Sequence, residues 1–119
     1  MNYRFYYPEW NNRKEVCKDY PQIKEITREP TSFWYGVGPK RTIRKTKKSI
    51  QRLLKRADPY LPVLVVYSIP YRDLGHHSKG GTGSDKEYLE FIREFCDALG
   101  DRSPIVIYEP DCIPHMEEM

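Results

Sequence analysis

Three apolar segments alternate along this chain with segments whose apolar residues recur at helical spacing. The apolar segments cover residues 31–38, 62–69 and 104–111, and all three are rich in β-branched and aromatic residues. The second, PVLVVYSI, is a nearly continuous apolar run, which is typical of a strand covered on both faces, as in a parallel sheet. We therefore predict three strands.

Two clean helical stripes lie between and after these strands. The first stripe is formed by Ile43, Ile50, Leu53, Leu54 and Ala57, and Asp58-Pro59 should end this helix. The second stripe is formed by Tyr88, Phe91, Ile92, Phe95 and Leu99. Ser84 and Glu87 form a capping box at its start, and Gly100 should stop it.

A further helix is predicted near the amino terminus, over residues 13–28. Its apolar positions are Val16, Tyr20, Ile23 and Ile26. Pro21 falls inside this segment and should kink or split the helix, and Pro30 closes it.

The predicted order is helix, strand, helix, strand, helix, strand. This alternation indicates an α/β fold with parallel strands and right-handed crossovers, in one domain over residues 1–119. In such folds ligands bind where the strands end, at the carboxyl edge of the sheet.

Composition sets the class of protein. The chain has 119 residues, of which 39% are hydrophobic and 31% charged, so a soluble globular domain is expected. The sequence has no run of about 18 apolar residues, so no membrane span is predicted. The first residues also lack the apolar core of a signal peptide. Three cysteines without CxxC spacing favour reduced thiols in a cytosolic setting, although this leaves the localisation undetermined.

The net charge of +3 conceals an uneven distribution. Residues 40–56 hold nine Lys or Arg and no acidic residue. Such a run is most often a solvated helix face, and less often a nucleic-acid-binding surface. We treat a nucleic-acid-binding module as the least favoured function.

Polar and aromatic residues gather where the predicted strands end. They are Trp34 and Tyr35 at the first strand, Tyr67, Arg72 and Asp73 at the second, and Glu109 and Asp111 at the third. Neighbouring carboxylates hinder each other's ionisation, so one of Asp73 and Asp111 can hold a proton and donate it to a leaving oxygen, as in glycoside hydrolysis. The alternative is two unrelated surface aspartates. Arg72 is either a carboxylate-orienting group or an exposed base, and Tyr67 is either a substrate contact or a half-buried core residue.

Other chemistries receive little support. His76, His77, Cys112 and His115 lack zinc-site spacing, so neither a metal nor a cofactor is expected. A Cys96 or Cys112 nucleophile has no local signature. The loop SKGGTGS lacks the ending of a phosphate-binding loop and is more typical of a mobile lid.

Two segments, VVYSIPYRDLGHHSKGG and IVIYEPDCI, together resemble glycoside hydrolase family 6, the inverting cellulases. The family's strand reads roughly V-V-Y-x-[IL]-P-x-R-D-C before a Ser/Gly loop, and its next strand carries [VI]-x-E-P-D. The matching residues are Tyr67, Pro70, Arg72, Asp73, Ser78, Gly80 and Gly81, then Glu109, Pro110 and Asp111. FYYPEWN and SFWYG resemble the family's opening segment and first barrel strand.

The resemblance implies roles for these residues. Asp111 would be the general acid, and Asp73 would assist it and stabilise positive charge at the anomeric carbon. Tyr67 would lie against the distorted sugar ring, Ser78 on the loop that closes over the substrate, and Trp34 would offer a stacking face. Arg72 and Glu109 complete the expected substrate-binding set.

The resemblance implies a β-1,4-glucan substrate and a partial β/α barrel, because the match covers nearly all of this chain but well under half of a family domain. Three strands leave open sheet edges, so we expect a homo-oligomer, most simply a dimer. The second possibility is that the chain is a fragment of a larger protein. A non-catalytic carbohydrate-binding remnant is the alternative to a hydrolase.

Overall fold

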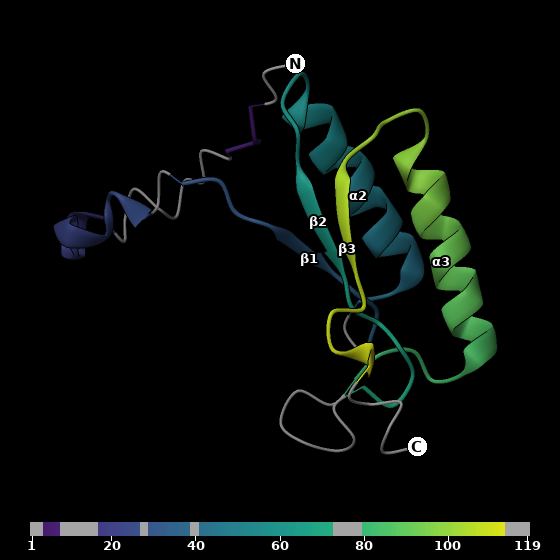
Figure 1. Cartoon of the computed structure of the whole chain (residues 1–119). Coiled ribbons are helices and arrows are strands. Elements are labelled where there is room, and N and C mark those ends of the chain that lie inside the picture. The colour runs from purple at the N-terminus through teal and green to yellow at the C-terminus, as the bar shows by residue number, and fades with distance from the viewer. Residues whose placement is uncertain (1–3, 8–16, 27–28, 39–40, 73–79, 114–119) are drawn as a thin grey trace.

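The computed structural model describes residues 4–7, 17–26, 29–38, 41–72 and 80–113. Its elements, in order, are the 3-10 helix η1 (Pro21–Ile23), strand β1 (Phe33–Tyr35), helix α2 (Ile43–Ala57), strand β2 (Val63–Val66), helix α3 (Asp85–Leu99) and strand β3 (Ile105–Tyr108) (Figure 1). The alternation of three strands with two helices is confirmed, and each strand is shorter than its apolar segment.

The three strands form one parallel sheet in the order β1-β2-β3. One row of the register joins Trp34 to Val65 and Val65 to Ile107. Right-handed crossovers in one direction place both connecting helices on the same face of the sheet. Figure 1 shows α2 and α3 side by side on that face. The predicted parallel α/β fold is therefore confirmed.

The hydrophobic core lies between the sheet and these two helices. Its buried members are Tyr35, Val37, Ile50, Leu53, Leu54, Leu64, Val66, Phe91, Phe95 and Ala98. Side chains alternate along a strand, so Tyr35, Leu64 and Val66 face the helices. Trp34 and Val65 consequently face the opposite side of the sheet.

Both helices begin at side-chain caps. The Thr42 hydroxyl accepts the N–H of Lys45 at 3.3 Å, and the Ser84 hydroxyl accepts the N–H of Glu87 at 3.2 Å. The Glu87 carboxylate turns back to the N–H of Gly83 at 2.6 Å, one residue before the position that a capping box uses. The predicted cap is confirmed in this slightly extended form.

The helix predicted over 13–28 is split at Pro21, as expected, and its described residues form only short helical turns. A helical turn at 17–19 ends before Tyr20, and Pro21 starts the short η1 instead. Proline lacks the N–H that a helix interior needs and is well suited to a first helical position. The η1 segment lies away from the sheet and its two helices (Figure 1). Among the described helices, none is long and apolar enough to cross a membrane.

Candidate active site

Trp34, Tyr67 and Arg72 come together at the carboxyl edge of the sheet. The Trp34 and Tyr67 rings meet edge to face, with centroids 6.0 Å apart. The Arg72 guanidinium lies 4.5 Å from the centre of the Tyr67 ring, and its Nη1 donates to the Tyr67 carbonyl at 2.9 Å. These three side chains form one aromatic and cationic cluster at the ends of β1 and β2.

Exposure within this cluster differs from residue to residue. Trp34 is 56% exposed, whereas Tyr67 is 8% exposed and is buried beside it. Trp34 therefore presents a flat apolar face with a polar edge to solvent, as sugar-binding platforms do. The buried Tyr67 ring packs against this platform on the protein side.

Glu109 lies inside the protein, although the sequence analysis expected it to contact the substrate. It is 2% exposed, and its carboxylate accepts the N–H of Ser68 at 2.9 and 3.0 Å and the N–H of Ile69 at 3.2 Å. The Tyr88 hydroxyl donates to the same carboxylate at 3.1 Å. All these donors belong to the protein, so the geometry gives Glu109 a positioning role at the junction of β2 and β3.

Ser68 connects all the strand ends, and the sequence alone did not single it out. Its hydroxyl accepts the N–H of Val37 at 2.9 Å, and its carbonyl accepts the N–H of Thr82 at 3.0 Å. With the bonds to Glu109, the single buried residue Ser68 joins the ends of β1 and β3 to the segment before α3. The available signal was a lone serine at the end of a run of valines, because a buried hydroxyl must find partners.

Tyr88 reaches this junction from α3. Its hydroxyl contacts the hydroxyl of Tyr108 as well as the carboxylate of Glu109. Burial raises the pKa of Tyr88 well above 10.0, and the hydrogen bond with Tyr108 and the charge of Glu109 raise it further. Tyr88 therefore stays protonated and acts as a donor to Glu109.

Asp111 follows in the turn after β3. Glu109 adopts a positive φ of 43°, and its carbonyl accepts the N–H of Cys112 at 3.0 Å. This tight turn leaves the Asp111 side chain exposed at the carboxyl edge of the sheet. Asp73 and Ser78 lie outside the described residues, as do His76, His77 and His115. The predicted proximity of Asp73 to Asp111 therefore stays a prediction.

The described part of the chain contains no group of three or more His, Cys, Asp or Glu side chains that could hold a metal ion.

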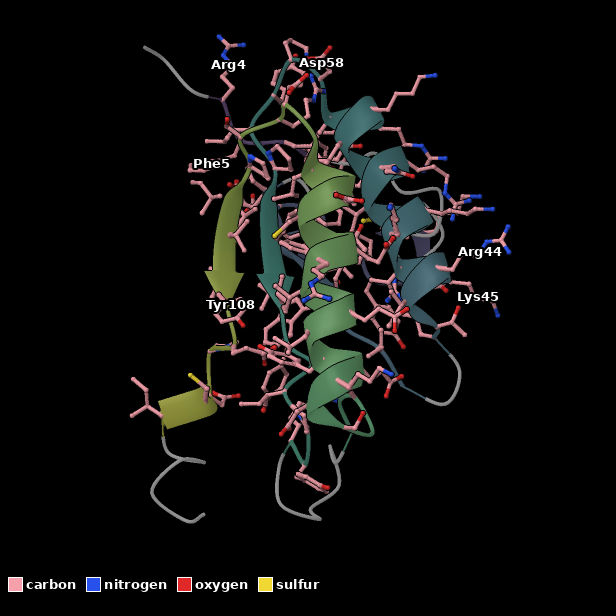
Figure 2. All side chains as sticks on the ribbon, turned by 90° about the vertical axis from the view of Figure 1, so that its right-hand side faces the viewer. Arg4, Phe5, Arg44, Lys45, Asp58 and Tyr108 are labelled. Atoms are coloured by element: carbon pink, nitrogen blue, oxygen red, sulfur yellow. The ribbon has the colours of Figure 1, made fainter. Side chains whose placement is uncertain are left out.

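The basic segment forms the outer surface of α2. Lys47 pairs with Glu94 at 2.6 Å and with Asp97 at 3.3 Å. The other bases of α2 are exposed, and Arg44 and Lys45 point away from the sheet (Figure 2). This arrangement is that of a solvated helix face.

Comparison with known proteins identifies the family. The sequence profile of Glycosyl hydrolases family 6 matches residues 8–119, which is nearly the whole chain. The chain belongs to glycosyl hydrolase family 6. The family predicted from the two motifs is thus confirmed.

Relatives within family 6 include two bacterial endoglucanases. The chain is 38% identical over 96 residues to Endoglucanase 1 of a Streptomyces species (strain KSM-9), covering 79% of this chain and 26% of that protein. It is 32% identical over 97 residues to Endoglucanase A of Thermobispora bispora, covering 81% of this chain and 21% of that protein. The chain thus spans about a quarter or less of these relatives.

A solved structure confirms the fold. The endoglucanase Cel6 of Mycobacterium tuberculosis, solved in complex with a methyl-cellobiosyl-thio-cellobioside, superposes with a TM-score of 0.85 at 21% sequence identity. The superposition covers 100% of this chain and 42% of that one. The described sheet and helices therefore have the fold of one part of a family 6 domain.

Proposed function

We propose that this chain is part of a cellulase-like glycoside hydrolase that cleaves β-1,4-glucosidic bonds of cellulose or cello-oligosaccharides with inversion. The observation that carries the proposal is the position of Asp111, an exposed carboxyl group at the tip of β3, on the sheet edge that also holds Trp34 and Arg72. Family membership supports the same reaction class.

In this proposal Asp111 is the general acid that protonates the glycosidic oxygen as the bond to the anomeric carbon breaks. Water attacks the opposite face of the sugar and gives up a proton to a general base or to bulk solvent, and the anomeric configuration inverts. Asp73 assists Asp111 and stabilises the positive charge that develops on the sugar. Ser78 belongs to the segment that closes over the substrate.

Trp34 stacks on a sugar ring next to the cleavage point. Tyr67 and Arg72 hold the Trp34 side chain in place from the protein side. Glu109 contributes through the backbone that it fixes. The whole fits an extended chain of neutral sugars, because the exposed surface of this cluster is aromatic and flat. We also propose that the chain associates as a homo-oligomer, which would cover the open edge of the sheet.

The test is release of reducing sugar from soluble and insoluble β-glucans, with Asp111→Ala compared with Asp101→Ala. Both aspartates are exposed, and they lie at opposite ends of β3. We expect Asp111→Ala to lose hydrolysis by at least a hundredfold and Asp101→Ala to retain it. Equal rates in Asp111→Ala and the parent chain would remove Asp111 from the role of acid.

A carbohydrate-binding remnant is the second candidate, and the exposed face of Trp34 is the observation that favours it. Binding of cello-oligosaccharides without any product would select this function. Binding of DNA or RNA that weakens steeply with salt would instead select the basic surface of α2.

A further inference from the structure

The turn that follows β2 exposes one large aromatic side chain. In this turn the N–H of Arg72 donates to the carbonyl of Ile69 at 3.3 Å. Ile69, Pro70 and Arg72 are half-buried, whereas Tyr71 is 70% exposed. Because β2 is the central strand of the sheet, the turn lies at its carboxyl edge, beside the candidate site (Figure 1). Tyr71 is not among the residues expected to bind the substrate.

Tyr71 has a backbone conformation that suits other residues better. Its φ is 57°, in the left-handed region, and Pro70 precedes it. Proline at the second position and a positive φ at the third are features of a type II turn. The third position of such a turn favours glycine or asparagine, because the Cβ of a larger residue is strained there. Strained backbone gathers at functional sites, so this placement points to a role for the tyrosine side chain beyond the fold.

Both ends of the turn are fixed by the protein beneath it. The N–H of Ile69 donates to the Glu109 carboxylate at 3.2 Å. The Arg72 guanidinium donates to the Tyr67 carbonyl at 2.9 Å and lies over the Tyr67 ring. Tyr71 is therefore held on a rigid support, which lowers the conformational entropy that is lost when a ligand binds to it.

The Tyr71 side chain has no internal partner in the described part of the chain. It makes no hydrogen bond, ion pair or ring contact with the residues that the structure describes. An exposed tyrosine offers a flat apolar face for packing and a hydroxyl for hydrogen bonding, which are the two features that a sugar ring can use. The same edge of the sheet holds the exposed face of Trp34.

We propose that Tyr71 is a second aromatic contact for the glucan chain, at the rim of the candidate site and separate from Trp34. Its ring packs against a sugar unit away from the cleavage point, so it contributes to affinity and takes no part in the chemical step. The inference rests on the proposed function, because it requires a β-1,4-glucan at the carboxyl edge of the sheet. It also predicts a trade-off, since relief of the strained turn would remove a binding contact.

The trade-off can be measured with two substitutions at this position. Tyr71→Gly removes the ring and relieves the backbone, so its urea midpoint should be no lower than that of the parent chain. Its dissociation constant for cellohexaose should rise about fivefold, as measured by calorimetric titration. Tyr71→Phe is the matched control, because it keeps both the ring and the strain. We expect its affinity to stay within about twofold of that of the parent chain.

The possible failures can be told apart. A parent chain that binds no cellohexaose would remove the proposed function, and this inference with it. Binding of cellohexaose that is equally tight in the parent chain and in Tyr71→Gly would leave the proposed function standing and exclude Tyr71 from the site. A lower urea midpoint in Tyr71→Gly would show that the fold itself requires the tyrosine, which would also overturn the inference.

Discussion

The carboxylate of Glu109 accepts the backbone N–H of Ser68 at 2.9 Å, and this contact ties the end of β3 to the end of β2. Both residues are buried, and the contact lies at the base of the candidate site. Buried carboxylates are costly unless they are fully hydrogen-bonded, and Glu109 has partners at the end of β2 and on α3. The relative position of the two strand tips is therefore fixed by the protein itself.

Glu109→Ala should destabilise the fold by about 3 kcal/mol, because it leaves the buried N–H of Ser68 and the partly buried N–H of Ile69 without an acceptor. Glu109→Gln should cost less, since its amide oxygen still accepts while its amide nitrogen faces a donor. Urea unfolding measures both values. The control is the exposed Glu90→Ala on α3, for which we expect a change within about 0.5 kcal/mol. A loss in Glu109→Ala no larger than that of the control would contradict this role.

Ser68→Ala should cost about 1–2 kcal/mol in the free energy of unfolding. The Ser68 hydroxyl accepts the N–H of Val37 at 2.9 Å, and removing the hydroxyl leaves this buried donor without an acceptor. The measurement is again the urea midpoint, with the exposed Ser103→Ala as the comparison. Equal midpoints for the two variants would show that the hydroxyl is dispensable.

Gly36→Ala should destabilise the protein by about 2 kcal/mol, and Gly38→Ala should be nearly neutral. A Cβ on Gly36 would lie 2.5 Å from the Tyr67 carbonyl, whereas a Cβ on Gly38 would meet nothing within 4 Å. The two glycines lie in the same connection between β1 and α2. Thermal unfolding of both variants measures the difference, and a more stable Gly36→Ala would refute the close packing on Tyr67.

Alkaline pH should destabilise the protein in part through Tyr88. Burial raises the pKa of Tyr88 above 10.0, so above roughly pH 10 the unfolded chain releases a proton that the folded chain retains. This contribution is fully present below pH 10 and is lost as the pH rises further. Burial also raises the pKa of Tyr35, and the hydrogen bond to Glu94 raises that of Lys47, so both add to the same slope.

Tyr88→Phe isolates the contribution of Tyr88, since the variant retains Tyr35 and Lys47. We expect urea midpoints to fall less steeply in the variant than in the parent chain between roughly pH 9 and pH 11. Parallel curves for the two proteins would show that Tyr88 titrates alike in the folded and unfolded states.

Trp34→Ala should weaken binding of cello-oligosaccharides about tenfold with little change in stability. Trp34 is 56% exposed, so its loss removes a stacking face and little core. Tyr60→Ala is the control, because Tyr60 is a similarly exposed aromatic residue before β2, at the other end of the sheet. Calorimetric titration gives both dissociation constants, and an equal effect of the two variants would exclude Trp34 as the platform.

Local sequence patterns determined the elements of this protein. The stripes on α2 and α3, the caps at Ser84 and Gly100, and the valine run of β2 depend on residues near one another in the chain. Their alternation determined the parallel sheet, and the two motifs determined the family. The sequence also predicted the split of the segment 13–28 at Pro21, because proline removes a backbone donor whatever the apolar spacing around it.

Only the tertiary structure decided what the polar residues do. Sequence placed Glu109 among the substrate contacts, and it passed over Ser68. Their roles depend on N–H groups and carbonyls from β1, β2 and the segment before α3, which are far apart in the chain and meet only when the sheet forms.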